Sequence, residues 1–183
     1  MTKQDYHHGE LRDALLDAAQ ARLCSQSLET LSMRMLAKDV GVSPGAPYHH
    51  FKDKSALRLA LCQRGFDQLS NDLDKYPALD GKIKAYFAFA VSNRALFELM
   101  FAPQATFGHS AAKLHPHAAP VYKCMEKALD DDFPSANEHS AIAVWAFLHG
   151  TALLLAASPI TMKLGEKNPL DFVIGFVERL RSD

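Results

Sequence analysis

The chain has 183 residues, of which 48% are hydrophobic and 22% are charged, a composition that is ordinary for a folded protein and excludes disorder as the default. The formal net charge of -1 gives no overall electrostatic preference for nucleic acid or membrane. The charge is uneven, however, because residues 30–64 carry six Lys and Arg against two Asp, whereas residues 65–183 carry more acidic than basic side chains.

Two helices are predicted before the first glycine-rich turn. Apolar residues fall on one face of residues 10–25, which predicts an amphipathic helix. Ser32 is placed to cap a short second helix over residues 33–40. Gly41 suits the left-handed conformation that ends such a helix.

Two more helices are predicted around a stretch rich in proline and histidine. Ser43 is placed to cap a short helix over residues 44–50, with Pro44 at its first position, where the missing N–H costs nothing. Asp53 is placed to cap a longer helix with a leucine stripe. The proline that follows Tyr76 predicts its end.

The remaining chain is also helical in pattern, with no strand-like alternation, and predicts an all-α fold of about nine helices. Five helices are predicted over residues 80–91, 94–101, 118–129, 136–157 and 169–181. Ser135 with Glu138 forms a capping box, and Asn168 is a cap. The acidic run 130–132 is unfavourable at a helix C-terminus and is expected to turn already. Residues 104–112 are expected to form a loop.

The two short helices around Gly41 have the dimensions of a helix-turn-helix, whose second helix enters the DNA major groove. Gly45 and Ala46 have almost no side chain, so the backbone there can lie close to base edges. Five residues that follow supply hydrogen-bond donors at a spacing that suits one edge of the groove: Tyr48, His49, His50, Lys52 and Lys54.

At this point the sequence resembles a known family. Residues 30–61, TLSMRMLAKDVGVSPGAPYHHFKDKSALRLAL, are similar to the DNA-binding domain of the tetracycline-repressor (TetR) family of bacterial transcription regulators. The positions that match its pattern are Leu36-Ala37, Gly41-Val42-Ser43, Tyr48, His50-Phe51, Lys54 and Leu57. The resemblance implies base contacts from Arg34, Pro44, Gly45, Ala46 and His49. It implies phosphate contacts from Ser32, Tyr48, His50 and Lys54, and we place Ser43 and Lys52 on the same DNA-binding surface.

One position departs from the family pattern inside the third helix. Pro47 stands where leucine or isoleucine is more usual, and a proline at that place is expected to shorten the helix. The direction in which Ala46 and His49 face the DNA depends on how the helix accommodates Pro47.

The later part of the chain resembles one subset of the family. Residues 85–103, AYFAFAVSNRALFELMFAP, and residues 145–150, WAFLHG, are similar to members whose C-terminal domain carries a Trp-x-x-x-His-Gly signature. Arg94 stands where that subset often has proline.

A candidate effector pocket is formed by apolar and aromatic residues of this part, together with one histidine: Phe87, Phe97, Met100, Phe101, Met125, Trp145 and His149. At helical spacing such residues are usually core, and a core histidine satisfied by one hydrogen bond is the alternative to a ligand contact. Both interpretations stay open at this point.

No metal, cofactor or catalytic residue is predicted. His115 and His117, with His109 nearby, are spaced for metal binding, but no cysteine or carboxylate close in sequence completes a set. A nucleophile elbow and a phosphate loop are both missing from the sequence, so we expect no enzyme.

Cysteine use and hydropathy predict a cytoplasmic protein. The three cysteines are odd in number and far apart, which favours reduced thiols over a disulfide framework; a redox-sensing thiol stays open. The first ten residues lack the apolar core of a secretory signal. The longest apolar run, residues 141–157, falls short of the roughly 20 residues that span a bilayer.

The function that follows is a sequence-specific transcriptional regulator, expected to be a repressor released by a small-molecule effector. Residues 1–65 are predicted to bind DNA and residues 66–183 to bind the effector and form a homodimer. The helices over 136–157 and 169–181 are predicted to pair with their copies as a four-helix bundle, which gives a palindromic operator. The alternatives are a helical ligand-binding or scaffolding protein without DNA binding, and a small α-helical enzyme.

Overall fold

The computed structural model describes residues 8–25, 30–102, 112–133, 138–156 and 169–182. Over these residues the chain forms eight α-helices and one 3-10 helix, without a strand, which confirms the all-α prediction. The helices are α1 (His8–Leu23), α2 (Met33–Asp39), η1 (Ala46–His49), α3 (Lys54–Asp74), α4 (Leu79–Ser92), α5 (Arg94–Met100), α6 (His115–Asp132), α7 (Glu138–Ala156) and α8 (Pro169–Ser182).

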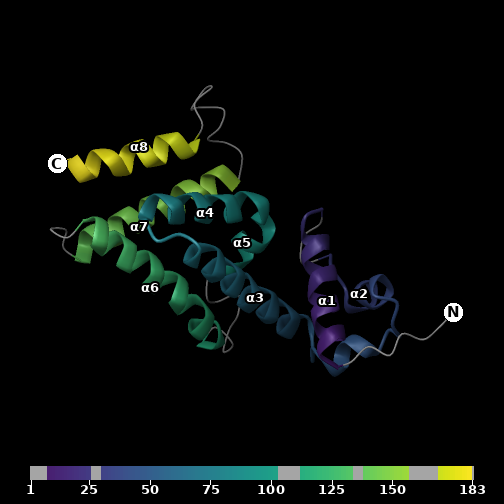
Figure 1. Cartoon of the computed structure of the whole chain (residues 1–183). Coiled ribbons are helices and arrows are strands. Elements are labelled where there is room, and N and C mark those ends of the chain that lie inside the picture. Colours follow the sequence, from purple (N-terminus) through teal and green to yellow (C-terminus); the bar gives the residue numbers. More distant parts are fainter. Residues whose placement is uncertain (1–7, 26–29, 103–111, 134–137, 157–168, 183) are drawn as a thin grey trace.

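The long helix α3 connects the two ends of the molecule. Figure 1 shows α1 and α2 at one end and α6, α7 and α8 at the other. Along its length α3 packs against α1, α4, α5 and α6, while α7 packs on α4 and α8. Residue 65, the predicted domain boundary, lies inside α3, so the two predicted domains share a continuous helix.

The predicted leucine stripe explains how α3 holds these neighbours together. Leu57, Leu61, Leu69 and Leu73 are all fully buried, and they recur at the spacing that places them on one side of a helix. Each such side chain stabilises the fold by about 1.5–3 kcal/mol relative to an exposed position. Among the described residues, no helix is long and apolar enough to cross a membrane.

The predicted ends of α2 are confirmed by its hydrogen bonds. The hydroxyl oxygen of Ser32 accepts a hydrogen bond from the Met35 N–H at 3.2 Å. Gly41 has a φ of 73°, the left-handed conformation that favours glycine. The Val42 N–H then donates back to the Ala37 carbonyl at 2.9 Å, which closes a Schellman motif.

The prediction of a third helix over residues 44–50 was wrong in where the helix starts and in its type. The sequence suggested a helix over 44–50 capped by Ser43, whereas the structure has the four-residue 3-10 helix η1 with Gly45 at its N-cap and no side-chain cap. Pro47 explains the difference, because in an α-helix its ring would meet the carbonyl four residues earlier, that of Ser43. Instead the Ala46 N–H bonds that carbonyl at 3.0 Å. Pro47 thus lies in the first turn of a shortened helix, as its departure from the family pattern predicted.

The starts of the next two helices are set by neighbouring acidic residues. Asp53 caps α3 as predicted, since its carboxylate accepts from the Ala56 N–H at 2.8 Å. Asp80 was predicted to start the following helix, but α4 begins one residue earlier, at Leu79, with Asp80 in its first turn. A carboxylate in that first turn still complements the helix dipole.

Helix α6 is longer than predicted at both ends. It begins at residue 115 rather than 118 and continues through the acidic run 130–132, which was expected to have turned. Ala128 and Leu129 are buried beside that run, and the Phe133 N–H closes the last turn on the Leu129 carbonyl at 2.8 Å. Burial of apolar side chains, at about 1.5–3 kcal/mol each, outweighs a dipole penalty of about 0.3–1 kcal/mol.

Some features predicted from the sequence involve residues outside the described ranges. They are the caps at Ser135 and Asn168, the loop over residues 104–112, and the metal-binding candidate His109.

Candidate nucleic-acid interface and aromatic cluster

All eleven residues predicted to bind DNA lie on α2, η1 and the segments that flank them. We call this set the η1 surface: Ser32, Arg34, Ser43, Pro44, Gly45, Ala46, Tyr48, His49, His50, Lys52 and Lys54. Ala46, His50 and Lys54 are half-buried and the other eight are exposed. Helices α2 and η1 pack directly on one another. The structure therefore brings together residues that the sequence separates by up to 22 positions.

The η1 surface is held from below by two buried rings. Pro47 is buried, as is Phe51, which is only 3% exposed. The Phe51 N–H donates to the Pro47 carbonyl at 2.9 Å, and the Arg12 guanidinium of α1 lies 5.6 Å from the centre of the Phe51 ring. Tyr48 lies between these two positions and is 52% exposed, so the same short segment is anchored on one side and presented on the other.

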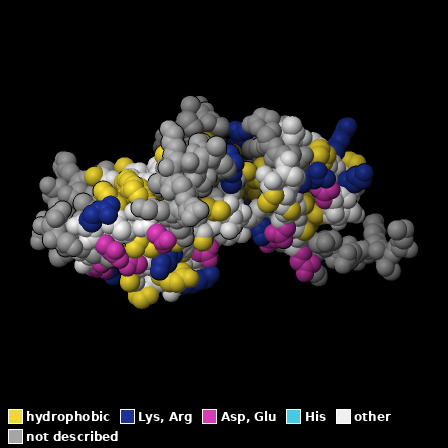
Figure 2. Space-filling view, turned by 90° about the horizontal axis from the view of Figure 1, so that it is seen from above, with side chains coloured by type: hydrophobic (Ala, Val, Ile, Leu, Met, Phe, Trp, Pro, Cys, Tyr) yellow, Lys and Arg dark blue, Asp and Glu magenta, His cyan; other side chains and the backbone are white. Residues whose placement is uncertain are grey.

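The charges of the η1 surface and its flanking residues favour an anion. Arg22 of α1 donates to Asp39 from Nη2 to Oδ1 at 2.6 Å, and this hydrogen bond lowers the pKa of the Asp39 carboxyl. Asp53 is engaged as the α3 cap. Both acidic residues of the basic stretch are thus occupied, whereas Arg34 and Lys52 remain exposed. Figure 2 shows blue Lys and Arg side chains over the end that carries α1 and α2, together with magenta Asp and Glu side chains.

Not every cation of the basic stretch belongs to this surface. Arg64 bonds Asp17 of α1, with Nη2 and Oδ1 2.5 Å apart, and so holds α3 to α1. Ser32, by contrast, can both cap and bind. Its oxygen accepts from the Met35 N–H, and a hydroxyl that accepts keeps its own hydrogen for another oxygen.

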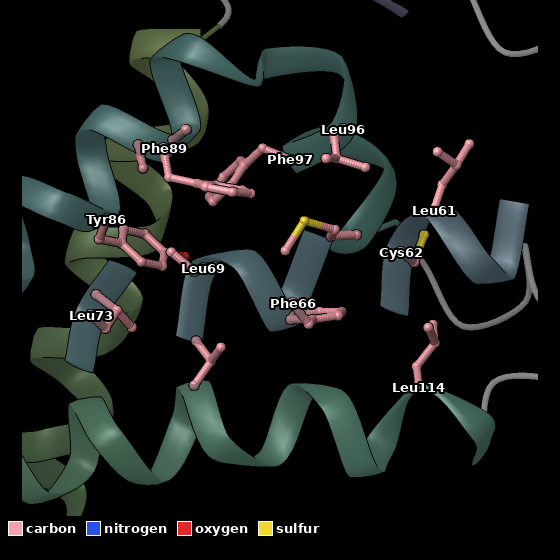
Figure 3. Packing of buried hydrophobic residues seen from close by; sticks show 14 of the residues in the cluster. Leu61, Cys62, Phe66, Leu69, Leu73, Tyr86, Phe89, Leu96, Phe97 and Leu114 are labelled. Carbon is pink, nitrogen blue, oxygen red and sulfur yellow. The ribbon is translucent and has the colours of Figure 1, made fainter. Parts of the chain in front are cut away.

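A second group of predicted residues meets in an aromatic cluster around Tyr86 of α4. Figure 3 shows Tyr86 and Phe97 among the buried hydrophobic residues. The Tyr86 ring lies 5.5 Å from that of Phe97 and 5.4 Å from that of Trp145. His149 lies 4.4 Å from Phe101 and 5.7 Å from Phe97, measured between ring centroids. Four of the seven predicted ligand residues therefore share one cluster, built from α4, α5 and α7 and from the residue that follows α5.

At the centre of the cluster two polar groups pair. Tyr86 Oη and His149 Nδ1 are 2.7 Å apart. Burial raises the pKa of Tyr86 and lowers that of His149, so both side chains are neutral and the phenol donates to the imidazole. This is the single hydrogen bond expected of a core histidine.

Tyr86 was missed as a site residue, although the sequence holds a signal for it. A tyrosine inside an apolar helix needs a partner for its hydroxyl, and His149 stands in a second apolar helix with the same need. Of the other three predicted residues, Phe87 borders the cluster, with its ring 6.3 Å from that of Tyr86. Met100 lies against Gly65, and Met125 is fully buried in α6.

A hollow that the sequence did not indicate lies between α1 and the junction of α4 and α5. Its volume is about 500 Å³, and Gln20, Cys24, Val91 and Asn93 are among the residues that line it. The Gln20 side-chain amide donates to the Asn93 amide oxygen at 3.3 Å. The hollow therefore borders the contact between the DNA-binding end and the body of the molecule.

The neutral pair at the cluster centre predicts a pH dependence of stability. Because burial lowers the pKa of His149 below its ordinary value of 6.5, the folded chain binds fewer protons than the unfolded chain, and stability falls as the pH falls through and below that value. His149→Asn keeps an acceptor but cannot titrate. Urea titrations between about pH 7 and pH 5 give the free energy of unfolding at each pH. As the pH falls, this free energy should fall less steeply for the variant than for the unmodified protein, and the two slopes should differ by at most the uptake of one proton on unfolding. Parallel slopes would contradict a neutral His149.

Comparison with known proteins identifies both halves of the chain. Residues 15–61 match the bacterial regulatory proteins of the tetR family, and residues 81–174 match the tetracyclin repressor-like C-terminal domain. A helix-turn-helix transcriptional regulator of Staphylococcus aureus strain USA300 is 25% identical over 132 residues, which cover 68% of this chain and 71% of the relative.

Solved structures share the fold of this chain. A protein of unknown function from Rhodococcus sp. RHA1 is 26% identical, with a TM-score of 0.81 over 98% of both chains. The transcriptional regulator FadR of Bacillus subtilis, in complex with stearoyl-CoA, has a TM-score of 0.65 at 14% identity, over 93% of this chain and 97% of that chain. The FadR likeness concerns the fold alone.

A helix-turn-helix unit joined by one long helix to an all-α body is the architecture of a DNA-binding transcription regulator. The C-terminal match covers half of the chain, and the chain belongs to the tetracycline-repressor (TetR) family. It is a DNA-binding transcriptional regulator of a family that is not enzymatic, and members of this family bind operator DNA and respond to small-molecule effectors.

Proposed function

We propose that this regulator is a repressor that binds a palindromic operator as a homodimer through the η1 surface and is released by a small-molecule effector. The observation that carries the proposal is the construction of η1, in which buried Pro47 and Phe51 support an exposed Tyr48 and His49. Residues 1–65 would serve DNA binding and residues 66–183 effector binding and dimerisation. In a bacterium such a protein works in the cytoplasm, where the DNA lies.

The 3-10 geometry divides the η1 residues between roles. Residues three apart lie on the same side of a 3-10 helix, so Ala46 and His49, the first and last residues of η1, face one way. We assign the contacts with base edges to this side, together with Arg34 and with Gly45, which has no side chain and lets the backbone approach. Base contacts specify the sequence, whereas phosphate contacts position the protein. Pro44 lies at the edge of the base-reading side. We assign the phosphate contacts to Ser32, Ser43, Tyr48, His50, Lys52 and Lys54.

Two single variants should separate these roles. His49→Ala should cost about 1–3 kcal/mol on the operator and relax the choice of one base position, with little change on random DNA. Lys52→Ala should weaken both DNAs alike and reduce the salt slope by about one. Titrations of both variants on operator and random duplexes at several salt concentrations measure this. An equal loss on both DNAs for His49→Ala would contradict its role in base recognition.

Selection of bound DNA from a random pool tests the function as a whole. The expected motif has two inverted half-sites whose centres lie about one helical turn, roughly 34–36 Å, apart. The motif also identifies the controlled genes by their upstream sequences. A pool that yields no recurring motif would contradict sequence-specific regulation by this chain.

We propose a dimer interface on α7 and α8. Phe147 of α7 and Phe176 of α8 lie 4.3 Å apart between ring centroids, so the two helices form one layer. On this layer Leu154 is 50% exposed and Phe172 is 40% exposed, and large apolar side chains gathered on a surface mark interaction sites. Pairing this layer with its copy gives a four-helix bundle.

We propose the aromatic cluster as the effector site and place the chain in the subset with a Trp-x-x-x-His-Gly signature, represented here by Trp145, His149 and Gly150. The cluster consists of rings around one neutral hydrogen-bonded pair, a chemistry that suits a mostly apolar molecule with one polar group. An effector that prefers a different position of α3 would change the separation of the two η1 surfaces and weaken DNA binding by population shift.

A further inference from the structure

Lys82 of α4 is a buried side chain without an acidic partner among its described contacts. It is 8% exposed, and its Nζ donates to the Leu73 carbonyl at 3.0 Å and to Cys124 Sγ at 3.1 Å. Lysine is almost never this buried unless its charge is paired. Of these two partners, only the sulfur is a nucleophile.

Cys124 lies between this lysine and a carboxylate. It lies half-buried on α6, and its thiol donates to Asp74 Oδ1 at 3.7 Å. Asp74, the last residue of α3, is exposed, so it can take the thiol proton and pass it to water. The sulfur therefore has a proton acceptor on one side and a hydrogen-bond donor on the other, which are the groups that a cysteine uses when it reacts as a nucleophile.

The other two cysteines have different surroundings. Cys62 is buried, its thiol donates to the Leu99 carbonyl at 3.6 Å, and burial raises its pKa to about 12. Cys24 is exposed and donates to the Gln20 carbonyl at 3.7 Å. Neither sulfur accepts a described hydrogen bond from lysine or arginine, so Cys124 differs from both in chemistry and not only in exposure.

We propose that Lys82 and Cys124 form an oxidant-responsive pair, which hydrogen peroxide or a small organic peroxide converts to a covalent sulfur–nitrogen bond between α4 and α6. The inference concerns this pair alone and does not depend on which DNA or effector the regulator binds.

The reaction balances with peroxide as the oxidant. The Cys124 thiolate attacks one peroxide oxygen, the S–O bond forms and the O–O bond breaks. The leaving hydroxide takes a proton from the Lys82 ammonium, which gives water, a sulfenic acid and a neutral amine. A sulfenic acid condenses with nitrogen nucleophiles. The amine therefore attacks the sulfur, the S–N bond forms, the S–O bond breaks, and the departing hydroxide leaves as water with an amine proton. Sulfur is oxidised and the peroxide oxygens are reduced.

Mass spectrometry of the full chain tests the proposal. In a Cys24→Ser background, hydrogen peroxide should give a species lighter than the reduced protein by two hydrogen atoms. Peptide mapping should join the segment that contains residue 82 to the segment that contains residue 124, and dithiothreitol should reverse the link. The link should also raise the thermal unfolding midpoint, because it closes a long loop of the unfolded chain.

Two lysine variants make the test specific. Lys84 lies two residues along α4 and is exposed, so Lys84→Met should form the link as before, whereas Lys82→Met and Cys124→Ser should lose it. In Lys82→Met, Cys124 should instead accumulate oxygen adducts. A disulfide between Cys62 and Cys124, or oxygen adducts on Cys124 without any link to Lys82 in the unmodified pair, would overturn the proposal.

Discussion

Replacing Phe97 by alanine is expected to lower the free energy of unfolding by about 3–5 kcal/mol. Phe97 is fully buried, and its ring lies 4.9 Å from that of Phe101 and 5.5 Å from that of Tyr86. The substitution removes the transfer free energy of the ring, leaves a cavity, and deletes ring pairs that contribute about 0.5–1.5 kcal/mol each beyond burial. Urea unfolding at one fixed protein concentration measures the loss, since self-association makes stability depend on concentration.

Phe101→Ala is the matched control for this substitution. Phe101 contacts the same cluster, including His149 at 4.4 Å, but it is half-buried. Because an exposed edge loses less on truncation and leaves a smaller cavity, its cost should be clearly below that of Phe97→Ala. Equal costs would contradict a cluster centred on Phe97 and Tyr86.

Features set by nearby residues could be predicted from the sequence. The caps at Ser32 and Asp53 and the left-handed Gly41 each depend on atoms within a few residues, so the local chemistry fixes them. The residues of the η1 surface were predicted on a different basis, the resemblance to the TetR family together with the spacing of the donors after Ala46. The type of η1 was missed because Pro47 would be the fourth residue of the predicted helix over 44–50, where its ring would meet the Ser43 carbonyl.

Features set by distant residues could not be predicted in this way. Tyr86 and His149 are 63 residues apart and Lys82 and Cys124 are 42 apart, so no local pattern joins them. The extension of α6 through its acidic run depends likewise on the burial of Leu129 against other helices. The sequence predicted which helices exist, and the packing of α3, α4, α6 and α7 decided which side chains meet.

A charge at position 154 is expected to abolish the dimer. Leu154 is 50% exposed on α7, on the layer that we propose pairs with its copy, and burying an unpaired carboxylate in a bundle core costs several kcal/mol. Light scattering of Leu154→Glu should therefore give the 20.2 kDa of one chain, whereas the unmodified protein should give twice that mass.

Loss of the dimer should also remove the gain from binding two half-sites at once. Linking two binding units raises the overall affinity by about 10²–10⁴ over a single one, so Leu154→Glu should bind a palindromic operator no better than an isolated half-site. Val91→Glu is the matched control, because Val91 is 60% exposed but lies at the end of α4, where it lines the hollow beside α1. It should stay dimeric and keep its operator affinity. If Leu154→Glu remains a dimer, the interface lies elsewhere, and the spacing of the two η1 surfaces has to be derived from another face.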